Sequence, residues 1–371
     1  MKKILILAGR YLPGHKDGGP LRTLINLTDA LCNEYEFFIA CYDRDHGDTE
    51  PYKGIEYGTW NTIGNAKVWY VPEGQFSKKL IMRLVEGKDV IYLTSFFEPY
   101  GYNTLLLKKE GKIKVPVALA SMGVFSKDAL AHKALKKRIF ILGCKVLRLF
   151  KDITWSVTSE LEAEDAKRVI GKNIKYVVAE DLPRTNVPGR KKGFDSTLRI
   201  VFLSRICEHK HPIIVIDAIE KMQHRDSVVF SLYGPIQEKE YWEKCLKKLE
   251  QIHYQWEYGG DVPSENVQEV LAKYDVFVLP SKSENYGHVV FEALSVGCIP
   301  VISNRTPWKE LDVENIGFEV PLDTESFTNR LDLIAEMSVR DRKEMADKCV
   351  AYAQKKVDES LKKTGYRRIF G

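Results

Sequence analysis

A regular alternation between short apolar runs and longer amphipathic stretches constrains the fold of this chain more than any other feature. The runs hold five to seven residues, and many are continuously apolar, as strands buried on both faces of a parallel sheet are. Strands that alternate with helices predict βαβ units. The expected strands are 3–8, 37–42, 67–71, 89–95, 115–121, 153–159 and 175–179, followed by 198–204, 228–234, 254–260, 275–280 and 299–303.

The alternation is interrupted once, at 182–197. This stretch holds two prolines, two glycines and a basic cluster, so we interpret it as an interdomain linker. A chain of 371 residues is long enough for two domains. The predicted fold is therefore α/β, with two Rossmann-like domains of doubly wound parallel sheet facing a central cleft. We expect domains at 1–185 and 186–354, with a C-terminal helix of about 355–371 packing back on the first.

Composition narrows the classes of function. Hydrophobic residues at 44% and charged residues at 29% are typical of a soluble globular enzyme. The net charge of +5 suits an anionic ligand or an acidic membrane surface and argues against a nucleic-acid partner. Seven cysteines without a C-x-x-C pair predict reduced thiols in the cytoplasm. The first apolar run is too short for a signal peptide, and no apolar window approaches the roughly 18 residues of a membrane span.

The stretch SENYGHVVFEALSVGCIP (283–300) directly follows an expected strand, where ligands of parallel sheets bind. Glu284 and Glu292 are eight positions apart, about 12 Å along a helix. Two acids that act on one glycosidic bond are only about 5–9.5 Å apart. Between them, Gly287 permits close backbone approach, and a helix beginning there offers amides to an anion. This order suits a nucleotide sugar, although a helix-capping Glu284 with a solvated Glu292 explains the spacing equally well.

Cations for a diphosphate are expected at a neighbouring strand end. Arg205 and Lys210 follow strand 198–204, so both side chains can reach the same edge of the sheet. An arginine binds phosphate oxygens through two nitrogens, and a lysine adds a point charge. The alternative is that both are surface cations near a helix start.

With these motifs in order, the chain resembles the retaining, nucleotide-sugar-dependent glycosyltransferases of family 4, which have the GT-B fold. The second half carries SRICEHK, SLYG, YGGDVP and the E-x7-E motif of VLPSKSENYGHVVFEALSVGCIPVIS, and the first half carries YLPGHKDGGPLRTLINL. GPIQEKEYW, ENYGH and the TPW of NRTPWKEL resemble the bacterial polysaccharide-building branch.

The resemblance implies roles for individual residues. Arg205 and Lys210 would bind the donor diphosphate and steady the leaving group, and Glu284 would hold the transferred sugar, which makes these three the expected catalytic residues. Glu292 would bond the ribose, and the backbone near Val262 would meet the base. The full set of expected donor-binding residues is Gly18, Gly19, Gly234, Val262, Asn285, Tyr286, Gly287, His288, Val289 and Glu292.

The implied reaction moves a hexose-type sugar from a nucleotide sugar, with UDP preferred over GDP, to a glycan or lipid-linked acceptor. The N-terminal domain would serve the acceptor and the C-terminal domain the donor. The expected pathway is cell-surface polysaccharide biosynthesis (capsule, O-antigen or exopolysaccharide). No cofactor and no metal is expected, because cations and helix amides can neutralise the leaving group. We interpret the triplet Asp43-Arg44-Asp45 as a loop feature.

Two departures from the family pattern leave the sugar specificity open. No histidine of the first domain can be assigned to the sugar site, and NRTPW replaces the usual Gly-Gly after strand 299–303.

The segment 123–151 is the candidate acceptor side. It holds eight Lys or Arg between Lys127 and Lys151 against one acid, Asp128. Apolar residues recur at helical spacing at Leu135, Ile139, Leu142, Val146 and Leu149. The segment could rest on anionic lipid at the inner face of the membrane, or pack its stripe on the sheet. For 139–150 we prefer packing, since that stretch is apolar nearly all round. Expected acceptor contacts are Gly123, Lys127, Lys133 and Lys137.

Other functions fit the same architecture. A sugar-nucleotide epimerase or a phosphorylase would share the fold, and product analysis with and without an acceptor separates these cases. A dinucleotide-dependent oxidoreductase is disfavoured, because no G-x-G-x-x-G follows a predicted strand. A non-catalytic binding subunit stays open until turnover is observed.

Overall fold

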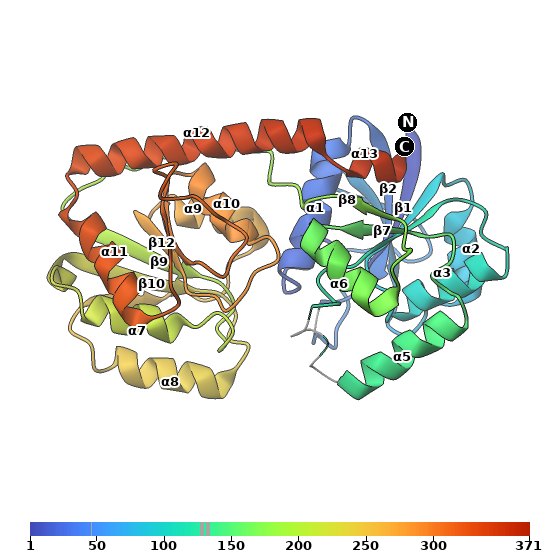
Figure 1. The fold of residues 1–371 in the computed structure, drawn as a ribbon, viewed down its shortest axis with the longest axis horizontal. Helices are drawn as coiled ribbons and strands as arrows, with labels where there is room; N and C mark the ends of the chain where they lie inside the picture. The colour runs from blue at the N-terminus through green and yellow to red at the C-terminus, as the bar shows by residue number, and fades with distance from the viewer. Residues whose placement is uncertain (46, 127–129, 131–133) are drawn as a thin grey trace. The chain divides into compact units, whose positions relative to one another are not determined.

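The computed structural model describes residues 1–45, 47–126, 130 and 134–371 (Figure 1). The chain forms two compact units. The first unit is Met1–Leu182 together with Ser360–Gly371, and the second unit is Pro183–Glu359.

The first unit is built on an eight-stranded sheet with the order β3-β4-β2-β1-β5-β6-β7-β8. All neighbouring strands are parallel except the β3–β4 hairpin. The strands are β1 (Lys2–Leu7), β2 (Tyr35–Tyr42), β3 (Asn61–Ile63), β4 (Ala66–Val71), β5 (Val90–Leu93), β6 (Val117–Ala120), β7 (Thr154–Val157) and β8 (Tyr176–Val178). Successive residues of β1 enter different clusters, with Leu5 and Leu7 in one and Ile4 and Ile6 in the other, so both faces of the sheet are buried.

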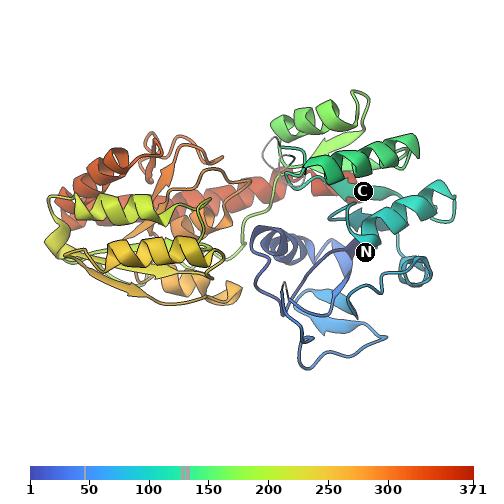
Figure 2. The ribbon, with the colours of Figure 1, turned by 90° about the horizontal axis from the view of Figure 1, so that it is seen from below.

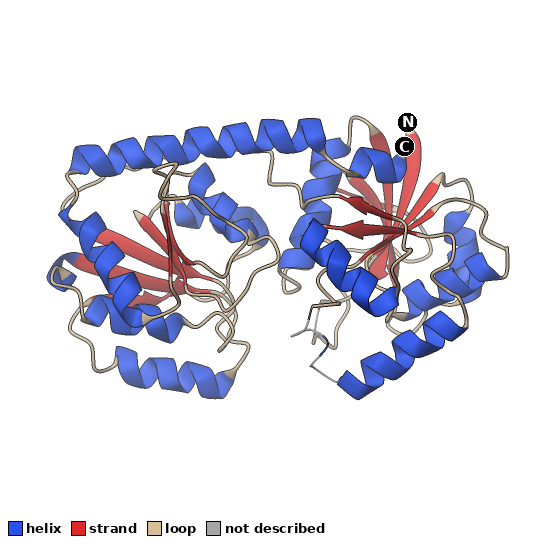
Figure 3. Ribbon diagram, in the orientation of Figure 1, coloured by secondary structure: helices blue, strands red, loops and turns tan. Residues whose placement is uncertain are grey.

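Helices cover both faces of this sheet (Figure 3). They are α1 (Gly19–Leu31), α2 (Lys78–Val85), α3 (Pro99–Lys109), α5 (Ala134–Val146), α6 (Glu160–Ile170) and the terminal α13 (Tyr366–Phe370). The last helix is part of the core of this unit. Phe370 is fully buried, and its ring lies 5.3 Å from that of Tyr35 and 5.8 Å from that of Tyr92.

The second unit is a six-stranded, wholly parallel sheet with the order β11-β10-β9-β12-β13-β14. Its strands are β9 (Leu198–Leu203), β10 (Val228–Tyr233), β11 (Gln255–Tyr258), β12 (Val276–Leu279), β13 (Ile299–Ser303) and β14 (Phe318–Val320). Its helices are α7 (Pro212–Glu220), α8 (Lys239–Leu249), α9 (Val267–Leu271), α10 (His288–Ser295), α11 (Thr324–Glu336) and most of α12 (Val339–Lys363). Figure 2 shows α7 and α8 side by side on one face of the sheet. The strand order reverses between β9 and β12, which is the switch point of a doubly wound sheet.

All twelve predicted strands are present, and the prediction of two doubly wound parallel sheets is confirmed. Two strands were missed, β3 and β14. Each has only three residues, as β8 does, but β3 (NTI) and β14 (FEV) contain polar residues and so lack the continuous apolar run that marked β8 (YVV).

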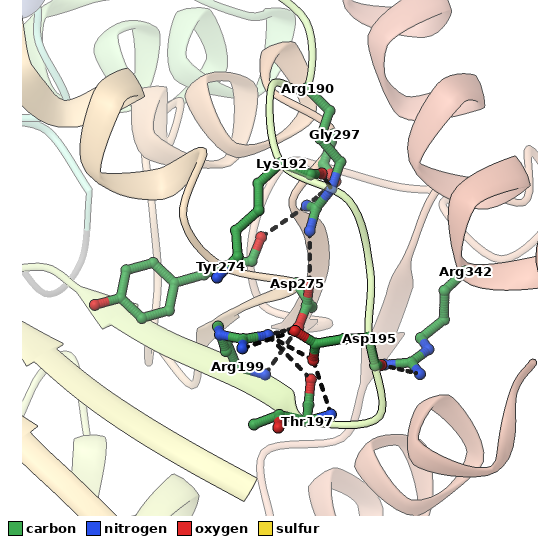
Figure 4. Close-up of polar contacts among 9 residues, drawn as sticks. All are labelled: Arg190, Lys192, Asp195, Thr197, Arg199, Tyr274, Asp275, Gly297 and Arg342. Carbon is green, nitrogen blue, oxygen red and sulfur yellow. Dashed lines mark hydrogen bonds and ion pairs between the residues drawn. The ribbon is translucent and has the colours of Figure 1, made fainter. Parts of the chain in front are cut away.

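The segment 182–197 is not a linker along its whole length, because most of it is held against the second unit (Figure 4). Arg190 donates to the carbonyl oxygens of Tyr274 (2.8 Å) and Gly297 (3.1 Å) and to Oδ1 of Asp275 (2.5 Å). The amide of Gly189 donates to the carbonyl of Ser295 at 3.0 Å. The chain passes between the units only after Leu182 and, within α12, after Glu359.

All seven cysteines are free thiols, and six of them are buried. Within the parts of the chain that the structure describes, no helix is both long and apolar enough to cross a membrane.

Candidate functional site

The loops after β9 and β12 lie together because these strands are neighbours at the switch point of the second sheet. The amide of Lys282 donates to the carbonyl of His209 at 2.9 Å. Nε2 of His209 lies 3.0 Å from the carbonyl oxygen of Ser283. The two segments that carry the predicted catalytic residues are thus joined by their own hydrogen bonds. His209 was not predicted, although it lies inside the SRICEHK motif.

Lys210 and Glu284 form an ion pair between these two loops. Their side chains are 10% and 11% exposed, so the pair is largely removed from water. The residue after Lys210, His211, has φ of 57°, a left-handed conformation that is uncommon outside glycine. Glu284 does not cap α10, because the cap residue is Gly287 at φ of 76°, without a side-chain hydrogen bond. The helix-capping interpretation of Glu284 is therefore wrong.

Arg205 lies at the start of the loop after β9 and is exposed. Its Nη1 donates to Oε1 of Gln237 at 2.8 Å. Gly234, at the end of β10, packs its backbone directly on this loop: a Cβ at position 234 would lie 2.0 Å from the carbonyl oxygen of Ser204. Position 234 therefore requires glycine, because a side chain would clash with the neighbouring loop that carries Arg205.

The turn before α10 is supported by Trp308. Its Nε1 donates to the carbonyl of Tyr286 at 2.6 Å, and the two rings lie 5.6 Å apart. The ring of His288 lies 4.7 Å from the ring of Tyr286. Trp308 belongs to NRTPW, so the motif that departs from the family pattern holds the backbone between Glu284 and Gly287. The sequence marked this motif without giving it a role.

Glu292 lies on α10 and is only 3% exposed, so its interpretation as a solvated surface acid is wrong. Nη1 of Arg184 lies 3.9 Å from its Oε1 and donates to Oε1 of Gln268 at 3.3 Å. Gln268 in turn donates to Oγ of Ser295 at 2.8 Å. A buried carboxylate needs a nearby cation, and Arg184 provides it. Arg184 was missed because it lies in the segment that was interpreted as a linker.

The remaining predicted donor residues of the second unit lie around the same edge of the sheet. Val262 follows β11 and is half-buried, and its amide donates to the side chain of Asp261 at 2.9 Å. Asn285 is exposed, and Val289 is half-buried on the first turn of α10. The first-turn amides of a helix have no acceptor within the helix, which makes this turn suitable for an anion.

In the first unit, Gly18 and Gly19 lie at the start of α1, after the long loop that follows β1. Asp45 holds this loop by accepting from the amides of His15 (2.7 Å) and Lys16 (3.1 Å). Asp43 accepts from Nε of Arg44 at 2.9 Å. These contacts agree with the interpretation of the acid-x-acid triplet as a loop feature. No cluster of three or more His, Cys, Asp or Glu suited to a metal ion occurs among the described residues. The predicted contact of the two glycines with the donor stays a prediction.

The candidate acceptor residues are only partly described. The amide of Gly123 donates to Oε1 of Glu162 at 2.5 Å, and Oε2 of the same buried carboxylate accepts from the amide of Thr158 at 2.6 Å. Lys137 is half-buried on α5. Lys127 and Lys133 lie outside the described residues.

Of the predicted apolar stripe, Leu149 is buried in the core as expected, but the part within α5 does not pack on the sheet. Ile139 and Leu142 are 61% and 60% exposed, whereas Ile141 and Cys144 are 5% and 4% exposed. The helix packs through its other face. Because the sequence is apolar nearly all round, the pattern did not show which face is covered.

Comparison with known proteins identifies the second unit. Residues 189–356 match the family model described as glycosyl transferases group 1. The second unit therefore carries a glycosyltransferase domain. The matched residues contain the loops of Arg205, Lys210, Glu284 and Glu292, so the site described above lies within the glycosyltransferase domain. No curated protein sequence matches the chain.

Solved structures similar to the whole chain establish its fold. HepE of Anabaena, solved in complex with UDP and glucose, superposes with a TM-score of 0.71 at 14% identity and 98% coverage of both chains. Sucrose-phosphate synthase of Thermosynechococcus elongatus gives 0.68 at 15% identity, covering 100% of this chain and 96% of the other. TarM of S. aureus, solved with UDP, gives 0.67 at 11% identity over the full length of both. The predicted GT-B fold is confirmed.

Proposed function

We propose that this glycosyltransferase belongs to the retaining family 4 and transfers a hexose-type sugar from a nucleotide sugar to a glycan or lipid-linked acceptor. One observation carries the proposal: Lys210 and Glu284 pair at the switch point of the second sheet, beside the first turn of α10. A cation and a carboxylate at the positions of leaving group and sugar are what such a transfer needs. The likeness to structures solved with UDP, glucose and UDP-glucose supports the choice of donor.

The donor diphosphate is proposed to bind at Arg205, Lys210 and the amides of the first turn of α10. The bond between the anomeric carbon and the diphosphate oxygen breaks as the bond to the acceptor oxygen forms, and negative charge grows on the diphosphate. Two cations and a helix N-terminus stabilise the negative charge that develops on the diphosphate in the transition state. Exposed Arg205 can form two hydrogen bonds to one phosphate without losing a buried partner.

The Lys210–Glu284 ion pair must open when the donor binds. Lys210 then turns to the diphosphate, and Glu284 accepts hydrogen bonds from hydroxyls of the sugar near its anomeric carbon. Without donor, each charge is neutralised by the other, and both side chains stay at the site. Trp308 holds the intervening turn, so the sugar meets a backbone of fixed shape.

The nucleoside is proposed to bind at the other end of α10. Glu292 accepts from the ribose hydroxyls, and the guanidinium of Arg184 lies 3.9 Å from this buried acid. The backbone near Val262 meets the base, for which we propose uracil in preference to guanine. In this proposal the sugar lies at Glu284, the diphosphate at the N-terminus of α10 and the ribose at Glu292.

The wider setting that we propose is cell-surface polysaccharide biosynthesis in the cytoplasm, with contact at the inner face of the membrane where the acceptor is lipid-linked. No divalent metal is required, because protein cations neutralise the leaving group. Full activity after treatment with EDTA is expected, and complete loss of activity would overturn this part of the proposal.

A screen of UDP-, GDP- and ADP-sugars by thermal shift tests the donor, since a bound ligand raises the unfolding temperature. We expect a shift with UDP-hexoses, followed by transfer to an acceptor with the anomeric configuration retained, as determined by NMR of the product. Inversion, or no shift with any sugar nucleotide, would overturn the proposal. Conversion of the donor to an isomer without acceptor would indicate an epimerase, and acceptor-independent phosphorolysis a phosphorylase.

A further inference from the structure

Helix α5 of the first unit carries an exposed apolar stripe. Leu135, Ile139, Leu142 and Val146 are 72%, 61%, 60% and 73% exposed. Their spacings of four, three and four residues place all four on one side of the helix. Single exposed apolar residues are ordinary, but a contiguous row of four on one helix marks an interaction surface.

The opposite side of α5 is already packed, so turning the helix cannot bury the stripe. Ile141 and Cys144 are buried in the core of the first unit. The ring of Phe140 lies 5.5 Å from that of Phe97 and 6.3 Å from that of Tyr102. In Figures 1 and 3, α5 lies at the periphery of the first unit. A surface helix of a globular protein normally presents polar residues on its outer side, and α5 presents leucine, isoleucine and valine.

Cations border the stripe on both sides. An ideal helix turns about 100° per residue, which places Lys136 on one side of the stripe and Arg138 and Lys145 on the other. All three are exposed, and α5 contains no acidic residue. Exposed Arg148 and Lys151 follow in the turns after the helix. An apolar row with a cationic border matches an anionic lipid surface: the apolar side chains enter the acyl boundary, while long basic side chains reach the phosphates.

We propose that this surface (Leu135, Ile139, Leu142 and Val146 with Lys136, Arg138 and Lys145, called the α5 surface) docks the enzyme on an anionic membrane. A second copy of the chain is a poorer occupant, because a two-fold contact through the stripe would bring the same cations against each other. The proposal concerns the first unit, and it stands or falls independently of which donor the second unit binds.

Co-sedimentation of the full chain with vesicles tests the α5 surface. The vesicles are phosphatidylcholine with roughly 30 mol% phosphatidylglycerol, and pure phosphatidylcholine is the reference. We expect the wild type to sediment with the anionic vesicles at low salt and far less with the reference. The double variant Ile139→Ser/Leu142→Ser should bind the anionic vesicles roughly tenfold more weakly than the wild type, since it removes two of the four inserted side chains.

A matched control removes equally exposed apolar residues elsewhere. Leu161 and Val313 are 75% and 82% exposed and lie outside the stripe, so Leu161→Ser/Val313→Ser should sediment like the wild type. The charge variant Lys136→Gln/Arg138→Gln should lose about fivefold in partitioning for each cation at low salt and less at high salt. Thermal unfolding and turnover with a water-soluble acceptor should be unchanged in all variants, which separates lost docking from lost folding.

Three results would overturn the proposal. The first is that the wild type does not bind anionic vesicles at low salt. The second is that the stripe variant binds as well as the wild type. The third is that gel filtration shows an oligomer that Ile139→Ser/Leu142→Ser converts to a monomer, in which case the stripe is a contact between protein chains.

Discussion

Strand β12 of the second unit has a carboxylate–cation pair at each end, and the two pairs differ in how completely they are satisfied. Before the strand, Asp275 is fully buried and pairs with Arg190. After the strand, Glu284 pairs with Lys210. Both are carboxylates beside a basic side chain at the end of a buried strand, so residue type alone does not distinguish them.

The pair before the strand is buried, and each partner is held by several hydrogen bonds. Oδ1 of Asp275 accepts from Arg190 at 2.5 Å, and Oδ2 accepts from the amide of Arg199 at 2.9 Å (Figure 4). Arg190 also donates to three backbone carbonyls, those of Lys192, Tyr274 and Gly297. A buried network of this kind fixes a segment in place, and its side chains, 7% and 1% exposed, are out of reach of a ligand.

The pair after the strand keeps bonding capacity. A lysine ammonium can donate three hydrogen bonds and a carboxylate can accept about four. Within the described residues, the structure gives the carboxylate of Glu284 one hydrogen bond, from Lys210. An ion pair at the end of a strand is therefore a candidate site when its partners hold few other hydrogen bonds, and a structural tie when several further hydrogen bonds fix each partner.

The largest effect expected from this comparison is on stability. Arg190→Ala leaves the buried carboxylate of Asp275 without its cation, which should lower the free energy of unfolding by about 3–5 kcal/mol. Urea denaturation followed by circular dichroism measures the change. The control is Lys282→Ala, which breaks an ion pair whose side chains are 37% and 64% exposed and should cost less than about 1 kcal/mol. Equal losses in the two variants would refute the structural role of Asp275.

The second effect is on turnover. Lys210→Ala and Arg205→Ala should each lower kcat/KM by about 10²–10³, because each removes a cation that we propose stabilises the leaving diphosphate. We expect both folds to remain intact: Arg205 is exposed, and for Lys210→Ala, which leaves the largely buried Glu284 without its cation, circular dichroism checks the fold. Steady-state kinetics with the best donor measures the loss. The same Lys282→Ala variant, changed in the neighbouring loop, should turn over normally, and near-wild-type rates in Lys210→Ala would disprove its assigned role.

The same two ion pairs show which parts of the site can be predicted from the sequence. Arg205, Lys210 and Glu284 could be identified because each follows a strand whose continuous apolar run is visible, and parallel strands bring such positions to one edge. The Arg190–Asp275 pair could not, because its partners are 85 residues apart and Arg190 lies in a stretch without periodicity. Arg184 and Trp308 were missed for the same reason. Their partners, Glu292 and the backbone of Tyr286, are set by tertiary packing.

Helix α5 shows a different limit of the sequence. Its residues are apolar on two sides, and periodicity reports an apolar face without saying what covers it. The packed side is the one with Ile141 and Cys144, next to aromatic residues of α3 and the preceding loop, which only the folded unit reveals.

A third, smaller effect divides binding from chemistry. Glu292→Ala should raise the dissociation constant for the nucleotide about 10–100-fold and change kcat less, because it removes the proposed ground-state contact to the ribose. Glu284→Ala should do the reverse, because its proposed hydrogen bonds to the sugar would count mainly in the transition state. Calorimetric titration with UDP and single-turnover rates measure the two parameters. If both variants change both parameters equally, the proposed division along α10 is wrong.

The smallest effect concerns Asp195, which belongs to the same network as Asp275 but lies at its exposed end. Hydrogen bonds from the Arg199 guanidinium, and then from the amide of Thr197, lower the pKa of Asp195 from 3.8 to about 2. A carboxyl whose pKa is lower in the folded state stabilises the fold at pH values above its unfolded pKa, and loses that contribution as the pH falls through the folded pKa. Asp195→Asn should therefore be slightly less stable than the wild type above about pH 5, and the difference should vanish between about pH 4 and pH 2. Urea midpoints of both proteins over this range measure it. A difference that persists in acid would mean that Asp195 acts through its shape and hydrogen bonds, as a neutral group does, and that the charge in this network is confined to the buried pair of Asp275 and Arg190.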